Sequence, residues 1–100
     1  TQTMTIEDWR DEIDLIDQQL LLLLNRRAQL AIEVGAIKRS SGMELWDNER
    51  EHDVLARVCA ANDGPLNTEA TARLFSLIIE ESRGIEAEIF LAEELQAKRA

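Results

Sequence analysis

The sequence has few of the residues that interrupt helices or favour strands. Its 100 residues include one proline, four glycines and no tyrosine. No segment shows the alternation of apolar and polar residues, bounded by turn signals, that is typical of a half-buried strand. A single cysteine, Cys59, cannot form an internal disulfide, which excludes a disulfide-stabilised secreted scaffold. These absences favour an all-α fold.

The charge balance and the apolar runs exclude several partners. The chain has 11 Lys and Arg against 20 Asp and Glu, and its net charge of −9 opposes nucleic acid and anionic membrane surfaces. The longest apolar run, Leu20 to Leu24, is too short to span a bilayer, and no signal-peptide pattern opens the sequence. We therefore expect a soluble, cytoplasmic protein, with residues 1–100 forming a single domain.

The clearest positive feature is an apolar stripe along a long predicted helix from Thr5 to Arg39. Thr5 is the expected N-cap, and Ser40-Ser41-Gly42 is the expected stop. The stripe keeps an unbroken 4-3 spacing, and its positions are Trp9, Ile13, Ile16, Leu20, Leu23, Arg27, Leu30, Val34 and Ile37.

This helix is too long for its own domain. Its 35 residues make a rod of about 52 Å at about 1.5 Å per residue. A compact globule of 100 residues has a diameter of only about 33 Å. Because the stripe runs the whole length, another chain must cover part of it, and a closed two-fold dimer is the commonest solution. We expect three helices per chain and an obligate, intertwined homodimer.

Two shorter patterns complete the expected fold. A second helix runs from about Asn48 to Ala61 with Asp47 as its N-cap, and a third, capped by Asn67, runs from Thr68 into the nineties. Residues 96–100 are expected to fray. Trp9 and Trp46 are expected to pack against neighbours. The other residues expected to face inward are Val54, Leu55, Val58, Cys59, Leu74, Ile78, Ile85 and Ile89.

Arg27 is a cation at a core position of the stripe. It could be a snorkelling side chain or a register-setting polar residue, or it could belong to an anion site. Lys38 follows eleven residues later, about 20° from a whole number of turns and about 16 Å along the axis. Both cations therefore project from one face and could bracket a ligand with two carboxylates.

Arg10 lies about 25 Å from Arg27 along the axis and about 100° around it. It cannot reach the Arg27 site of its own chain. In an antiparallel pair of long helices it could reach the partner's.

Two further pairs of polar residues lie one helical turn apart. Asp47 and Glu51, with Arg50 between them, could simply be a solvated helix start. Ser82 and Glu86 flank the apolar stripe of the third helix. No phosphate-binding loop and no metal-spaced Cys and His cluster is present, and the one histidine, His52, is expected at the surface. We expect no metal and no cofactor.

Five segments, taken in order and with their spacing, resemble the all-helical class of chorismate mutase. The likeness extends over about residues 7–90. The segments are Trp9-Arg10-Asp11-Glu12-Ile13-Asp14-Leu15-Ile16-Asp17, Leu23-Leu24-Asn25-Arg26-Arg27-Ala28-Gln29-Leu30-Ala31, Val34-Gly35-Ala36-Ile37-Lys38, Asp47-Asn48-Glu49-Arg50-Glu51 and Leu74-Phe75-Ser76-Leu77-Ile78-Ile79-Glu80-Glu81-Ser82.

The resemblance implies conversion of chorismate to prephenate, on the route to phenylalanine and tyrosine, in a homodimer whose two sites use both chains. It implies that Arg27 and Lys38 form the cationic clamp, with Arg10 contributed by the partner subunit. It also implies the roles of the remaining residues: Asp47 and Glu51 beside the ring hydroxyl, Arg50 in the pocket wall, Ser82 at a carboxylate and Glu86 at the ether oxygen.

Two positions depart from the pattern of many relatives. Trp46 stands where many have a basic residue, and Glu86 stands where many bacterial members have glutamine. An isochorismate-pyruvate lyase shares the fold and the cations, but the pair of Asp47 and Glu51 favours the mutase. A non-catalytic helical dimerisation module would leave Arg27 and Lys38 unpaired on an apolar interface, which is costly.

Overall fold

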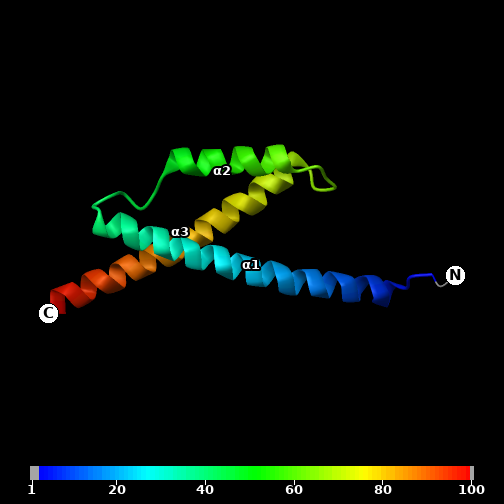
Figure 1. The fold of residues 1–100 in the computed structure, drawn as a ribbon, viewed down its shortest axis with the longest axis horizontal. Helices are drawn as coiled ribbons and strands as arrows, with labels where there is room; N and C mark the ends of the chain where they lie inside the picture. Colours follow the sequence, from blue (N-terminus) through cyan, green and yellow to red (C-terminus); the bar gives the residue numbers. More distant parts are fainter. Residues whose placement is uncertain (1–2, 100) are drawn as a thin grey trace.

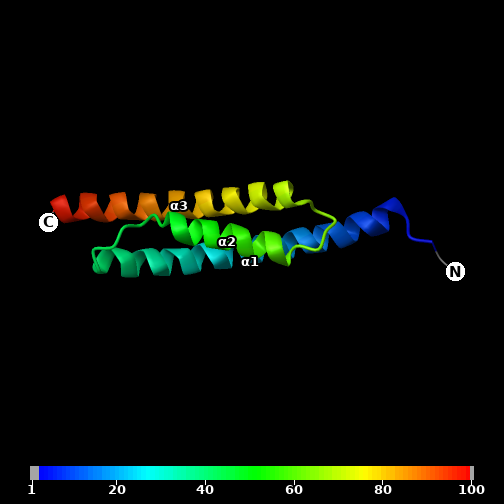
Figure 2. The same cartoon turned by 90° about the horizontal axis from the view of Figure 1, so that it is seen from above.

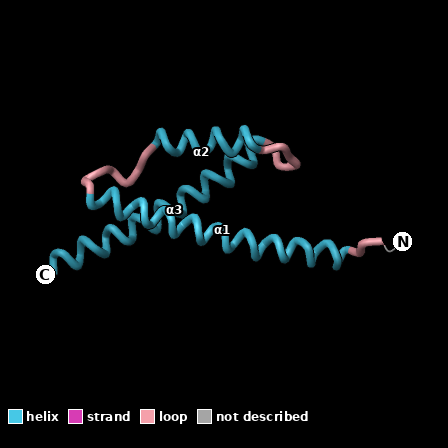
Figure 3. Tube along the Cα trace, viewed as in Figure 1, coloured by secondary structure: helices cyan, strands magenta, loops and turns pink. Residues whose placement is uncertain are grey.

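The computed structural model describes residues 3–99, which form three α-helices: α1 (Ile6–Ser40), α2 (Asn48–Ala61) and α3 (Thr68–Arg99). Figure 3 shows only helices, loops and turns within these residues, and no strand. The all-α prediction and the order of the three helices are confirmed. The predicted helix starts agree with the structure to within a residue.

The ends of α1 have local causes. At the N-terminus, the Asp8 amide donates to Thr5 Oγ1 at 3.2 Å and the Thr5 amide donates to Asp8 Oδ2 at 2.9 Å, forming a capping box. These hydrogen bonds to Thr5 lower the pKa of the Asp8 carboxyl. At the other end, Gly42 has a φ of 71°, which other residues rarely adopt, and the Met43 amide donates to the Lys38 carbonyl at 2.8 Å.

α3 joins the other two helices. It packs against both α1 and α2, whereas α1 and α2 make no close backbone contact within the described residues. In Figure 1, α1 and α3 cross, and the end of α2 meets the start of α3. Figure 2, seen from above, shows all three helices running along one long axis. The N-terminal end of α1 extends beyond the rest of the chain in both views.

The single chain leaves its apolar stripe uncovered. Its radius of gyration is 18.4 Å and its extents are 69 × 29 × 16 Å, whereas a compact chain of this length has a radius of about 13 Å. No hydrophobic side chain is fully buried among the described residues. The eight apolar residues of the α1 stripe are each 50% to 63% exposed. The predicted overhang of α1 is therefore present.

Two expectations need correction. Residues 96–99 do not fray but remain helical, because neither glycine nor proline follows Gly84 and the basic last turn suits the helix dipole; residue 100 lies outside the described residues. Leu74 is 49% exposed, whereas the other seven residues expected to face inward are half-buried. Trp9 and Trp46 are 57% and 61% exposed in the single chain. Trp46 lies 5.7 Å from the Arg83 guanidinium, and the packing of Trp9 against a second chain stays a prediction.

Within the described residues, no helix combines the length and the apolar character that crossing a membrane requires.

Candidate active site

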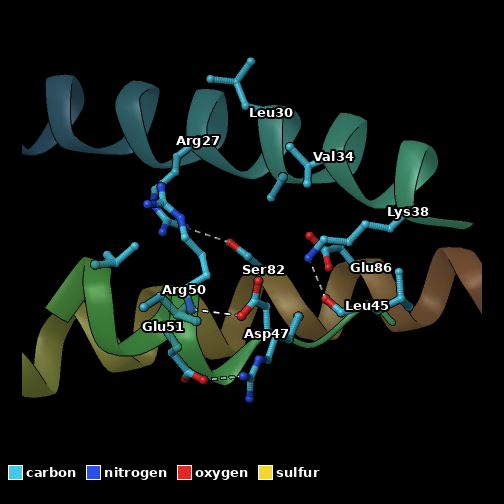
Figure 4. A pocket seen from close by; sticks show the side chains of 14 residues that line it. Arg27, Leu30, Val34, Lys38, Leu45, Asp47, Arg50, Glu51, Ser82 and Glu86 are labelled. Carbon is cyan, nitrogen blue, oxygen red and sulfur yellow. Dashed lines mark hydrogen bonds and ion pairs between the residues drawn. The ribbon is translucent and has the colours of Figure 1, made fainter. Parts of the chain in front are cut away.

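A pocket with a volume of about 270 Å³ opens between the second half of α1, the start of α2 and the middle of α3 (Figure 4). Its apolar wall comes from all three helices and from the connection before α2, with Leu30, Ala31 and Val34 on α1. The pocket brings together seven of the eight residues expected from the sequence: Arg27, Lys38, Asp47, Arg50, Glu51, Ser82 and Glu86.

α1 supplies the two cations that the helical spacing placed on one face. Arg27 Nη1 donates to Ser82 Oγ on α3 at 3.3 Å. Lys38 Nζ donates to the Leu45 carbonyl in the connection between α1 and α2 at 3.1 Å. Figure 4 shows both side chains reaching from α1 toward the other elements, with Val34 between them on the helix. The two cations thus mark opposite ends of the pocket, and each already has a hydrogen-bond partner.

The start of α2 supplies two carboxylates and an arginine. Asp47 is the N-cap, and its Oδ1 accepts a hydrogen bond from the Arg50 amide at 3.0 Å. The cap fixes Asp47 at the start of α2. Glu51 lies one helical turn further along, and therefore on the same, pocket-facing side of the helix. The Arg50 guanidinium pairs with Asp53 on the surface of α2, at 3.3 Å.

Ser82 and Glu86 are two of the most buried residues in the chain, each 9% exposed. They lie one turn apart on α3, so that both face α1. Burial raises the pKa of the Glu86 carboxyl, and nearby Lys38, Arg39 and Arg83 oppose that rise. Desolvation is the larger effect, so Glu86 retains its proton to a higher pH than an exposed glutamate does.

Gly35 lets α3 approach α1 closely behind Glu86. A Cβ at this position would lie 3.3 Å from Glu86 Cγ and 3.4 Å from Arg39 Nη1, closer than most side-chain contacts. Arg39 is held in this space by Glu93 on α3, with Nε to Oε2 at 2.9 Å and Nη2 to Oε1 at 3.2 Å. Its Nη1 is buried and has no hydrogen-bond partner within the described residues.

Arg10 lies outside this pocket. Its guanidinium pairs with Glu7 on the same helix at 3.0 Å, and both side chains are largely exposed. The position on the overhanging part of α1 agrees with the helical arithmetic, which places Arg10 out of reach of its own chain's site.

Two arginines near the site were not singled out from the sequence. Arg83 lines the pocket, pairs with Glu51 and lies 5.7 Å from the Trp46 ring centroid. Its spacing from Glu86, three residues on one helix, could have revealed it. Arg39 could not be found in this way, because its partner Glu93 is 54 residues away in the chain.

The pocket carries positive charge in a strongly acidic chain. Four cations, Arg27, Lys38, Arg50 and Arg83, face three carboxyl groups, Asp47, Glu51 and Glu86, which leaves one net positive charge when all are ionised. With Glu86 protonated the excess is two. Such a pocket suits a small molecule with two carboxylates.

Nothing in the described residues offers a metal site, because no three His, Cys, Asp or Glu side chains converge. His52 is exposed, as expected. Cys59 is half-buried near the start of α3, with Sγ 3.8 Å from the Thr68 carbonyl.

Known proteins are similar to this chain in both sequence and fold. Residues 9–87 match the family described as chorismate mutase type II. The chain is 40% identical over 83 residues to a bifunctional chorismate mutase/prephenate dehydratase of Neisseria gonorrhoeae, covering 83% of this chain and 22% of that protein. It is also 40% identical over 74 residues to the Escherichia coli K12 protein of the same name, covering 73% of this chain and 19% of that protein. The chain therefore spans about a fifth of the length of these relatives.

Among solved structures, one form of chorismate mutase from Thermus thermophilus superposes with a TM-score of 0.81 at 33% identity, covering 82% of this chain and 93% of that one. A second form gives a TM-score of 0.76 at 34% identity and covers 77% of this chain and 96% of that one. Since the family match extends from the first helix to the buried acid of the third, this chain belongs to the chorismate mutase type II family.

Proposed function

We propose that this chain converts chorismate to prephenate, as one subunit of a homodimer in which each site uses residues of both chains. The observation that carries the proposal is the convergence of Arg27, Lys38 and Glu86 in one pocket. The family match and the similarity to chorismate mutases support it. The single cysteine fits a reducing compartment, and we place the reaction in the cytoplasm.

The proposed reaction requires few catalytic groups. Chorismate rearranges in one unimolecular step, in which a C–O bond breaks while a C–C bond forms. No nucleophile, metal or net proton transfer is needed. An enzyme accelerates such a step by holding the flexible dianion in its folded conformer and by stabilising the negative charge that grows on the ether oxygen.

The cations on α1 suit these two tasks. Arg27 is a planar guanidinium that can grip a carboxylate through two N–H groups, and Ser82 beside it adds a hydroxyl donor. Lys38 is a compact point charge with three donors, so it can keep its hydrogen bond to the Leu45 carbonyl and still donate to the ether oxygen.

Glu86 faces Lys38 across the pocket and must donate a hydrogen bond to assist the same oxygen. Only the protonated carboxyl can donate. Burial favours that form by raising the pKa, and two substrate carboxylates would raise it further. The active form of Glu86 in this proposal is therefore the neutral acid.

In the proposed dimer, a second subunit covers the apolar stripe of α1 and contributes Arg10 to the pocket. The stripe on α1 exposes eight apolar residues, among them Trp9, Ile13 and Leu20, and their burial against a partner is worth about 25 cal/mol per Å² of apolar surface. Arg10 lies on the overhanging part of the same helix. In a two-fold dimer with antiparallel α1 helices, Arg10 of each subunit reaches the pocket of the other.

An isochorismate-pyruvate lyase is the nearest alternative activity. Asp47 and Glu51 favour the mutase: both carboxylates line the pocket, whereas the lyases that the sequence also resembles have apolar or small residues at these two positions. The purified protein is incubated separately with chorismate and isochorismate. Formation of prephenate supports the proposal, salicylate from isochorismate supports the lyase, and no turnover of either substrate indicates a non-catalytic dimerisation module.

The dimer is expected to remain associated until it unfolds, because the uncovered α1 stripe has no other partner. In sedimentation velocity runs at micromolar concentration, the protein should sediment as a dimer. Thermal unfolding should shift to higher temperature as protein concentration rises. A folded monomer under these conditions would contradict both the dimer and the role of Arg10.

The cationic clamp is expected to be sensitive to single substitutions. Arg27→Ala and Lys38→Ala should each lower kcat/KM by about 10²-fold or more, the scale for loss of a preorganised charged donor. Arg26→Ala is the matched control, because Arg26 lies beside Arg27 but is exposed and outside the pocket. An equal loss in Arg26→Ala would mean that the effect is not specific to the clamp.

Subunit mixing tests whether Arg10 acts across the interface. Inactive Arg10→Ala and Arg27→Ala chains are mixed in equal amounts and allowed to exchange. Half of the dimers become mixed, and each mixed dimer has one site with both arginines, so about a quarter of wild-type activity should return. Exchange without recovery would exclude a role for Arg10 in the partner's site.

The pH dependence of the rate should report the protonation of Glu86. Since the neutral acid is the active form, kcat should fall as pH rises through the pKa of Glu86 in the complex. Glu86→Gln, which donates at every pH, should flatten this decline and keep substantial activity. Arg39→Leu removes one of the cations that lower the pKa, so the decline should move to higher pH. A wild-type profile that is flat from about pH 5 to 9 would contradict this role.

A further inference from the structure

Arg83 lines the pocket, and its guanidinium contacts other side chains of the protein. The guanidinium pairs with the Glu51 carboxylate and lies 3.5 Å from Asn48 Oδ1, both on α2. It also lies 5.7 Å from the centre of the Trp46 ring, within the range of a cation–π contact. One side chain of α3 thus contacts both the start of α2 and the connection before it.

This contact lies where α2 has little other support. In Figure 1, α2 meets α3 at the end of α2, and the two helices diverge toward the start of α2. Within residues 3–99, the pair of Arg83 and Glu51 is the one ion pair that joins α2 to another helix; the other ion pairs of α2 are internal. Arg83 therefore links the start of α2, where α2 and α3 diverge, to α3 across the pocket.

The ion pair with Arg83 also determines which carboxylate oxygen of Glu51 can accept a further hydrogen bond. Its Oε2 accepts from Arg83 Nη2, whereas Oε1 accepts no hydrogen bond within the described residues. Both side chains are largely buried, with 29% of Arg83 and 25% of Glu51 exposed, so the ion pair is only partly screened by water. Arg83 offsets a negative charge that would otherwise oppose a dianionic ligand, and it leaves one oxygen free to accept from a hydroxyl group.

We propose that Arg83 is a positioning residue that orients Glu51 toward the hydroxyl-bearing end of the substrate, with Trp46 holding the guanidinium in place. This inference rests on the proposed function for the nature of the substrate. In this proposal Arg83 acts through Glu51 rather than by gripping a substrate carboxylate, because its Nη2 contacts Glu51 and Asn48 on α2 and its guanidinium lies against the indole ring.

A double-mutant cycle in steady-state kinetics separates these two roles. Arg83→Met and Glu51→Gln are measured singly and together, and Arg83→Lys tests rescue by a residue that keeps the charge. Arg73→Met is the matched control, because it removes the same charge from an exposed position of α3 outside the pocket.

Arg83→Met should raise KM about 10-fold and change kcat less than about threefold, the scale of one charged hydrogen bond. The same substitution in the Glu51→Gln background should have almost no further effect, because the residue through which Arg83 acts is already altered. Arg83→Lys should recover part of the affinity, and Arg73→Met should behave as the wild type. Additive effects of the two pocket substitutions would overturn the proposal and indicate direct binding of a carboxylate by Arg83.

A second measurement needs no substrate. In a Trp9→Phe background, Trp46 is the only tryptophan, and its emission should change with Arg83→Met but not with Arg73→Met. Unfolding of the same four cycle proteins should show coupling between Arg83 and Glu51. Absence of both signals would show that the contact is not formed. A wild type without mutase activity but with both signals would contradict the proposed function and the substrate-orienting role, while leaving the contact itself established.

Discussion

The length of α1 determines how much of its apolar stripe the rest of the chain can cover. A helix of 35 residues carries an apolar stripe from end to end, and the remaining residues form only one helix that crosses it and a second that does not contact its backbone. Half or more of the surface of each apolar stripe residue stays exposed in the single chain. In the proposed dimer, this stripe is buried against the same stripe of a second copy of the chain. Assembly and site formation are therefore linked in the proposed enzyme.

The crossing of α1 and α3 shows how such an open fold still builds a defined pocket. Gly35 permits close approach, and Glu86 is buried directly against it. Arg39 and Glu93 close the outer side of this contact with two hydrogen bonds. The acid is thus desolvated, which raises its pKa, while three cations around it keep that rise in check. Balance between these effects, rather than one residue, sets the pH range in which a neutral Glu86 is present.

Sequence reasoning could predict what depends on local spacing. The bounds of α1 follow from Thr5, Asp8 and Gly42, and the common face of Arg27 and Lys38 follows from the helical repeat. The prediction that residues 96–99 fray was wrong, because the absence of a stop signal outweighs the low apolar content of this segment. Arg39 with Glu93, and Trp46 with Arg83, could not be predicted, because these contacts depend on how the helices cross and on the path of the connection before α2.

In the proposed enzyme, the cationic pocket binds a folded dicarboxylate and is completed by the second chain. A crystal structure with a bicyclic dicarboxylate that mimics the transition state tests it most directly. We expect one mimic in each pocket, with one carboxylate on Arg27, the ether oxygen between Lys38 and Glu86, and Arg10 of the partner subunit within about 3.2 Å of the ligand. An empty pocket at saturating mimic, or a bound mimic contacted by one chain alone, would contradict it.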